Sequence, residues 1–153
     1  LAVTALQSLA SSATAGWKSV MVDNLTATLA IDYEIFVKIT TANTAPANDK
    51  MVYIYICPWF YDGTSWYQTD AGTATLPSSA DATYTIANPN NLSLGLALNY
   101  TTQLMVMQGS FLLSSVFGNN MPDGFSIIII NFSGAALSTG CIVDVKPIFL
   151  TIA

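Results

Sequence analysis

Two carboxylates with a spacing that could support chemistry lie close together, at Asp32 and Glu34. On a strand they stand on one face about 7 Å apart, close to the separation that glycosidases use between their two carboxyl groups. Alternate charged positions are also the ordinary pattern of a solvent-exposed strand face, and no neighbouring motif indicates a cleft. We therefore favour the solvent-exposed face over an Asp/Glu hydrolase.

The residue types that are missing restrict catalysis further. The chain has no histidine, and its four basic residues are all lysines, so arginine is absent as well. Without histidine there is no Ser-His-Asp or Cys-His machinery and no imidazole general base. Without arginine there is no bidentate clamp for phosphate or carboxylate. We expect a protein that is not an enzyme and has no catalytic residues, cofactor or metal.

The two cysteines, Cys57 and Cys141, have no CxxC spacing and are too few to form a metal site by themselves. Each lies in or beside an apolar run that is typical of a strand. We favour two buried free thiols that pack as small apolar side chains, and a disulfide remains the alternative.

Aromatic residues concentrate around an Asp-Gly pair at 62–63, where Trp59 and Tyr61 precede the turn and Trp66 and Tyr67 follow it. The Asp-Gly pair predicts a hairpin over 59–68. Exposed rings in such a hairpin would form a platform on which sugars stack, as in carbohydrate-binding modules. The same rings would otherwise fill the core or a contact between subunits, which is the interpretation we favour.

Composition limits the partners. The 153 residues carry a net charge of −5, and only 8% are charged while 52% are hydrophobic. Nucleic-acid binding needs clustered Lys and Arg, so it is not expected. No window of about 18 residues is continuously apolar, as a membrane-spanning helix requires. We therefore expect neither a nucleic-acid nor a membrane partner.

Period-two patterns indicate strands through most of the chain. Between Ile31 and Thr40 the odd positions are apolar and the even ones mostly polar, which predicts a strand with one buried face. The runs 51–57, 103–108 and 127–130 are apolar on both faces, and the last consists of four consecutive isoleucines within a strand expected over 125–132. Such β-branched runs are typical of strands covered on both sides.

Further strands are expected along the rest of the sequence. Four leucines, at 92, 94, 96 and 98, fall on one face of a strand, and another strand is expected over 103–108. The run 111–117 fits either a strand or one helical turn, and closing strands are expected over 141–146 and 148–152. The spacing predicts an all-β fold, a single antiparallel β-sandwich of jelly-roll type with about eight to ten strands. It comprises a domain over 17–153 and an N-terminal arm over 1–16.

The strands that are apolar on both faces exceed what one sandwich needs to form its core. Soluble monomers seldom expose apolar patches beyond a few hundred Å², and the centres of protein interfaces are poor in charge. Both considerations favour assembly into a homo-oligomer over a monomer. A monomer kept soluble by its Thr, Ser and Asn residues is the alternative.

A motif near the start resembles small structural proteins of tailed bacteriophages. The segment Leu9–Trp17 (LASSATAGW) precedes a Val-Asp-Asn element at 22–24, an Asp-Tyr strand start at 32–33 and the strand Asp49–Tyr55 (DKMVYIY). The resemblance covers mainly the first 70 residues, and a weaker likeness lies around 117–118 and 131–134. The chain departs from the pattern at 57–60, where Cys-Pro-Trp-Phe is less polar, which leaves a tail or head-fibre role open.

The resemblance implies a capsid decoration (cement) protein with a jelly-roll-like fold. Such a protein would lie on the virion surface, bind the major capsid protein as a homo-oligomer, most commonly a trimer, and be assembled in the host cytoplasm. The N-terminal arm would order on binding and supply assembly contacts. The apolar residues we assign to this role are Leu1, Val3, Leu6, Leu9 and Trp17.

Overall fold

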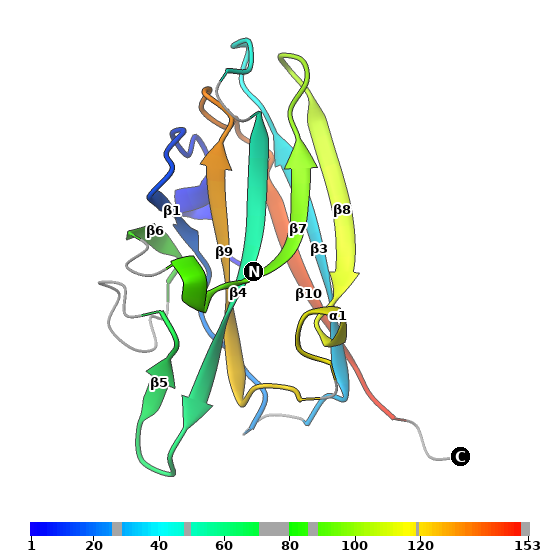
Figure 1. The fold of residues 1–153 in the computed structure, drawn as a ribbon. Coiled ribbons are helices and arrows are strands. Elements are labelled where there is room, and N and C mark those ends of the chain that lie inside the picture. The colour runs from blue at the N-terminus through cyan, green and yellow to red at the C-terminus, as the bar shows by residue number, and fades with distance from the viewer. Residues whose placement is uncertain (26–28, 48–49, 71–79, 86–88, 119, 151–153) are drawn as a thin grey trace.

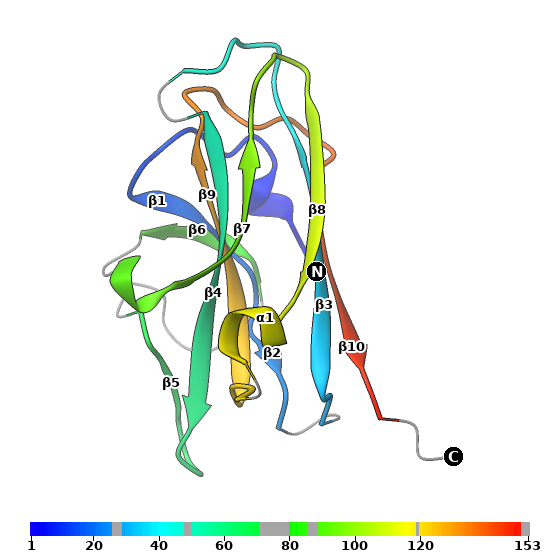
Figure 2. The ribbon, with the colours of Figure 1, turned by 45° about the vertical axis from the view of Figure 1, so that its right-hand side comes forward.

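The computed structural model describes residues 1–25, 29–47, 50–70, 80–85, 89–118 and 120–150. Two antiparallel sheets lie face to face and enclose a core (Figures 1 and 2). The prediction of an all-β sandwich is confirmed, and its helices, η1, η2 and α1, have three or four residues each. Their bounds are Thr4–Leu6 for η1, Pro89–Asn91 for η2 and Ser114–Phe117 for α1.

The large sheet has the strand order β5-β4-β9-β1-β6, with β2 paired to β9 and β7 paired to β4. The small sheet has the order β10-β3-β8. The strands of the large sheet are β1 (Ala15–Lys18), β2 (Val22–Asp23), β4 (Met51–Tyr61), β5 (Trp66–Gln68), β6 (Ala82–Thr85), β7 (Ser93–Asn99) and β9 (Gly124–Phe132). Those of the small sheet are β3 (Asp32–Thr40), β8 (Val106–Leu112) and β10 (Ile142–Ile148).

The predicted alternation along β3 is confirmed. Its odd positions, among them Ile35, Val37 and Ile39, are fully buried in the core, whereas the even positions are only half-buried. Strand β3 lies between β10 and β8, so its backbone is paired on both sides. The small sheet therefore presents one apolar face to the core and one mixed, partly charged face outward.

Strand β9 is buried on both faces, as its run of isoleucines predicts. Ile127 and Ile129 belong to the core between the sheets, whereas Ile128 and Ile130 belong to a second cluster on the outer face of the large sheet. Strand β9 pairs with β4 over nine consecutive positions, from Met51 opposite Phe132 to Trp59 opposite Gly124. This pairing is the longest in the large sheet and forms its centre.

The four leucines of the β7 region do not share one face, so that prediction is wrong. Tyr55 lies opposite Leu94 and Ile54 lies opposite Leu96, which leaves Gly95 as the extra residue of a β-bulge. The bulge reverses the alternation. Leu96 and Leu98 therefore pack against the core, whereas Leu94 is exposed on the outer face.

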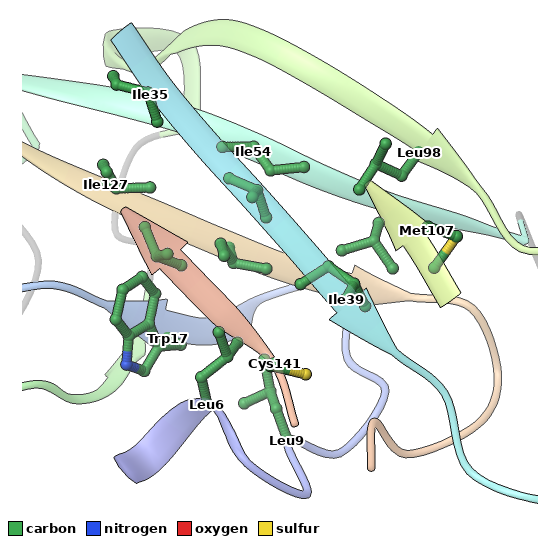
Figure 3. Close-up of a cluster of buried hydrophobic side chains, with 14 of the residues drawn as sticks. Leu6, Leu9, Trp17, Ile35, Ile39, Ile54, Leu98, Met107, Ile127 and Cys141 are labelled. Atoms are coloured by element: carbon green, nitrogen blue, oxygen red, sulfur yellow. The ribbon is translucent and has the colours of Figure 1, made fainter. Parts of the chain in front are cut away.

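The segment 1–16 is not a free arm, and this expectation is corrected. Leu6 and Trp17 are fully buried and Leu9 is nearly so, all three within the core (Figure 3). Backbone bonds hold the segment in place, from Ser12 N–H to the Asn131 carbonyl and from Leu137 N–H to the Leu9 carbonyl. The segment is part of the sandwich domain.

Several boundaries also differ from those expected. Strand β8 begins at Val106 rather than at 103, and the run 111–117 divides into the end of β8 and the turn α1. One continuous strand, β10, replaces the two closing strands, and residues 151–152 of the second lie outside the described residues.

The position of Leu6 predicts that Leu6→Ala destabilises the isolated protein. Truncating a buried leucine removes its transfer energy and leaves a cavity, which costs about 2–5 kcal/mol. The control is Leu1→Ala, because Leu1 is exposed and should change the free energy of unfolding by less than about 0.5 kcal/mol. Urea unfolding measures both variants. Equal stabilities for the two would mean that the segment is detached in solution.

Candidate functional site

The Asp32 and Glu34 carboxylates lie on one strand, but Asp32 is engaged in local structure. Its Oδ1 atom accepts hydrogen bonds from the backbone N–H groups of Tyr33 (2.8 Å) and Ser114 (3.0 Å). Its Oδ2 atom accepts a bond from the Ser114 hydroxyl. Burial acts to raise the pKa of Asp32, but the bonds from Ser114 and Tyr33 outweigh it and hold the pKa below its ordinary value. Asp32 thus attaches α1 to the start of β3.

The predicted aromatic hairpin is present, as the β4–β5 pair. Asp62 forms its turn, because its carboxylate accepts the N–H groups of Thr64 (2.9 Å) and Ser65 (2.7 Å). These bonds lower the pKa of Asp62. The hairpin is attached to the rest of the domain through Asp123, whose Oδ2 atom accepts the N–H of Tyr61 at 2.9 Å.

The hairpin does not gather the four predicted platform residues on one surface. Trp59 is buried and donates its Nε1–H to the Ser126 hydroxyl (3.0 Å), so it belongs to the interior. Tyr61 lies opposite Trp66 with 5.1 Å between ring centroids, and Phe60 lies opposite Tyr67.

The two pairs therefore occupy opposite faces of the hairpin. Phe60 and Tyr67 are both about half exposed. Phe60 was not among the four predicted residues. Its pairing with Tyr67 nevertheless follows from the cross-strand register of the Asp-Gly hairpin.

A buried lysine on the outer face of the large sheet was missed by the sequence analysis. The side chain of Lys18, on β1, is 6% exposed. Its Nζ atom lies 4.7 Å from the centroid of the Trp59 ring and 4.5 Å from that of Tyr84, and it donates a hydrogen bond to the Gln68 side chain. Two aromatic faces stabilise the ammonium group by cation–π attraction.

Other polar groups surround this lysine. The Asp70 carboxylate is fully buried and accepts the Tyr84 hydroxyl, and both Asp70 and the Cys57 thiol are near enough to interact electrostatically with Lys18. Burial lowers the pKa of Lys18, against the opposing effects of Cys57 and Asp70. Burial also raises the pKa of Cys57, so the thiol stays protonated at neutral pH.

This Lys18 cluster joins β1 and β6 to the β4–β5 hairpin, since Lys18, Trp59, Gln68 and Tyr84 come from β1, β4, β5 and β6. An amine of lowered pKa is the chemistry of Schiff-base lysines. Here the rings of Trp59 and Tyr84 and the Gln68 amide enclose the amine. We therefore interpret the cluster as a structural link between neighbouring strands and not as a site for a reacting molecule. Both cysteines are buried free thiols, as expected.

The residues assigned to assembly are mostly inside the molecule. Leu6, Leu9 and Trp17 are core residues, Val3 is half-buried, and only Leu1 is exposed. The physical reason is that η1 and β1 complete the core and the large sheet. The side chains of Leu6, Leu9 and Trp17 therefore cannot also contact a partner while the domain is folded.

Exposed apolar side chains instead collect at one end of the sandwich. The β4–β5 turn, the start of β3 and the end of β10 lie at the bottom of Figures 1 and 2. The exposed apolar residues lie in the β4–β5 hairpin, just after β2, just before β3 or just after β10. We call this end of the sandwich the apolar end, and its exposed large hydrophobic residues are Leu25, Leu29, Ile31, Phe60, Tyr61, Tyr67, Phe149 and Leu150.

Comparisons with family models, with curated proteins and with solved structures give no match to this chain. Within the described ranges, no group of three or more His, Cys, Asp or Glu side chains is placed to hold a metal ion. No helix in that part of the chain is long and apolar enough to cross a membrane.

The Lys18 cluster predicts a specific pH dependence of stability. Because the pKa of Lys18 is lowered from its ordinary 10.5 in the folded state, the unfolded chain binds more protons between the lowered value and 10.5. Stability contributed through Lys18 therefore rises with pH across that window. In Lys18→Met this contribution is lost. The free energy of unfolding of the variant should therefore become progressively lower than that of the parent protein as pH increases.

Urea unfolding between pH 6 and 10 measures this difference. Both proteins carry Cys57→Ala, so that the titration of the neighbouring thiol does not enter the comparison. Lys146→Met, at an exposed lysine on β10, is the control substitution. A stability difference between parent and Lys18→Met that stays constant across the pH range would contradict the assignment.

Proposed function

We propose that the protein is a non-enzymatic structural component of a tailed-phage virion that decorates the capsid and stabilises it by binding the lattice of the major capsid protein. The observation that carries the proposal is the apolar end. A structural protein of this kind needs a surface to bury against neighbours and needs neither a catalytic group nor a cofactor.

The exposure of the apolar end supports a contact surface. Leu29 is 74% exposed and Leu150 is 70% exposed. Burial of either side chain against a partner would be favourable, because it removes apolar surface from water. Phe149 and Ile31 are about half exposed beside them in the same two segments. Apolar side chains that stay exposed near one another are typical of protein-binding sites.

A repetitive partner suits such a surface. Each apolar contact is worth only a few kcal/mol, but copies bound to a regular lattice, and to one another, gain avidity without a strong single site. The resemblance of the first 70 residues to phage structural proteins implies this setting, together with a homotrimer and jelly-roll connectivity. Its place would be the outer surface of the capsid, after assembly in the host cytoplasm.

The proposal predicts that Leu29→Ser combined with Phe149→Ser weakens binding to empty capsids about tenfold or more, because both side chains lose burial on the capsid. Leu94→Ser is the matched control, since Leu94 is also about half exposed but lies on the outer face of the large sheet. Co-sedimentation with capsids measures binding, and thermal unfolding checks that all proteins fold. Equal binding by the two variants would exclude the apolar end as the contact.

The alternative is a carbohydrate- or receptor-binding module of a head or tail fibre. It is favoured by one specific observation, the exposed cross-strand pair of Phe60 and Tyr67. The burial of Trp59 leaves a smaller platform than the sequence predicts, with Tyr61 and Trp66 on the opposite face.

A glycan array separates the two functions. The decoration proposal predicts no glycan binding by the intact protein and no change for Phe60→Ala with Tyr67→Ala. A specific glycan signal that this double variant abolishes would support the fibre function instead.

A further inference from the structure

The borders of the two sheets are protected unequally. An unpaired border strand offers free backbone N–H and C=O groups to any other strand, and proteins usually block it by shortness, bulges, proline, charge or a covering segment. In the large sheet the border strands β2, β5 and β6 have two to four residues, and β7 carries the bulge at Gly95.

Strand β10 (Ile142–Ile148), one border of the small sheet, is blocked at several positions and at Cys141, which directly precedes it. The Gln7 side chain donates to the Cys141 carbonyl (2.9 Å) and accepts the Cys141 N–H (3.2 Å), as a neighbouring strand would. Further along, the Leu1 nitrogen donates to the Val143 carbonyl. Beyond that point the Val145 N–H is bonded to the Asp144 carboxylate, and Pro147 has no N–H.

In the part of the chain that the structure describes, strand β8, the other border, has none of these devices. The bonds from Leu113 N–H to the Tyr33 carbonyl and from Thr41 N–H to the Met105 carbonyl show that odd positions pair with β3. The backbone groups of the even positions therefore point away from β3. These outward positions are Val106, Gln108, Ser110 and Leu112.

The outward N–H groups of β8 have no partner among the described residues, and of the outward carbonyls only that of Leu112 accepts a bond, from Ser115. Strand β8 is the last strand of the small sheet, at its outer border in Figure 1, and Figure 2 shows it separate from β7. Strand β8 has seven residues and contains no charge and no proline. It is thus an open template for strand addition.

We propose that β8 pairs with β8 of a second copy of this chain, antiparallel and across a two-fold axis at Gly109. Full overlap of the strand places position 106 opposite 112 and position 108 opposite 110. In this register each residue whose N–H and C=O groups point away from β3 lies opposite another such residue in the second copy. The two residues can then exchange both backbone hydrogen bonds, as hydrogen-bonded antiparallel pairs do. The proposal goes beyond the proposed function and does not depend on it.

The side chains fit this register. Val106 and Leu112, which are 49% and 43% exposed, would lie opposite each other, so each covers an apolar surface that the monomer leaves in water. Gln108 would lie opposite Ser110, polar against polar. At the axis Gly109 lies opposite Gly109 of the second copy, so no side chains collide there.

Charge does not prevent a second copy from binding at this border. Two chains of net charge −5 repel each other, and β8 is a seven-residue strand where they can meet without placing like charges opposite one another. The result is a six-stranded sheet that continues β10-β3-β8 into the second copy. If trimers form through another face, the same pairing would link neighbouring trimers.

A register-specific cross-link tests the proposal. Opposed residues of a hydrogen-bonded pair have Cα atoms about 5.5 Å apart, within the range that a disulfide spans. A mixture of Gln108→Cys and Ser110→Cys proteins should form a disulfide-linked heterodimer under mild oxidation, at least about fivefold more than either protein alone. Equal yields in all three samples would overturn the register.

Charge substitutions test the interface without covalent bonds. Gln108→Lys with Ser110→Lys places lysine opposite lysine and should raise the dimer dissociation constant about tenfold or more, whereas Gln108→Lys with Ser110→Glu restores opposite charges and should recover dimerisation. Sedimentation velocity over a concentration series measures both.

A parent protein that stays monomeric at about 100 μM would overturn the pairing, as would equal self-association of the two double variants. All measurements are made without capsids. Failure here is therefore distinguishable from loss of capsid binding through the apolar end.

Discussion

The pairing of β9 with β4 is the interaction on which the rest of the structure depends. Nine consecutive positions are paired, and every residue from Gly124 to Asn131 is buried. Strand β9 also pairs with β1 and β2, so the N-terminal segment is held against it. Because β9 is apolar on both faces, the domain needs cover on both sides of the large sheet.

That requirement explains the unusual features of the outer face. The second apolar cluster, around Ile128 and Ile130, includes Tyr84 and Cys57, which also border the Lys18 cluster. The buried lysine lies beside this second cluster, because the Tyr84 ring belongs to the cluster and also faces the Lys18 ammonium group. The large apolar side chains that remain exposed lie mainly at the apolar end and along β8. Both places are suited to contacts between chains.

The sequence predicted the features that depend on local pattern. Alternation identified β3, β-branched runs identified β4 and β9, and the Asp-Gly pair identified the hairpin. The bulge at Gly95 could not be predicted, because it follows from how β7 pairs with β4. It fits a glycine, since a Cβ atom there would lie 2.4 Å from the Phe111 ring.

The N-terminal segment shows a second limit. Its Ala, Ser and Thr residues resemble an arm, but Gly16 lets β1 approach β9 so closely that a Cβ atom would lie 2.4 Å from the Ile129 carbonyl oxygen. Of the candidate site, the hairpin followed from the sequence. The burial of Trp59 agrees with the favoured interpretation that the aromatic rings of the hairpin fill the interior. The burial of Lys18 did not follow from the sequence, because it depends on strands that are distant along the chain.

The most direct test of the account compares backbone hydrogen exchange in the free protein and in the protein bound to empty capsids. Exchange in β9 should be very slow in both states, because its amides are buried and paired. On capsids, new protection should appear in the β4–β5 hairpin and in the segments around Ile31 and Phe149. Unchanged exchange in those segments, or rapid exchange in β9, would contradict the account.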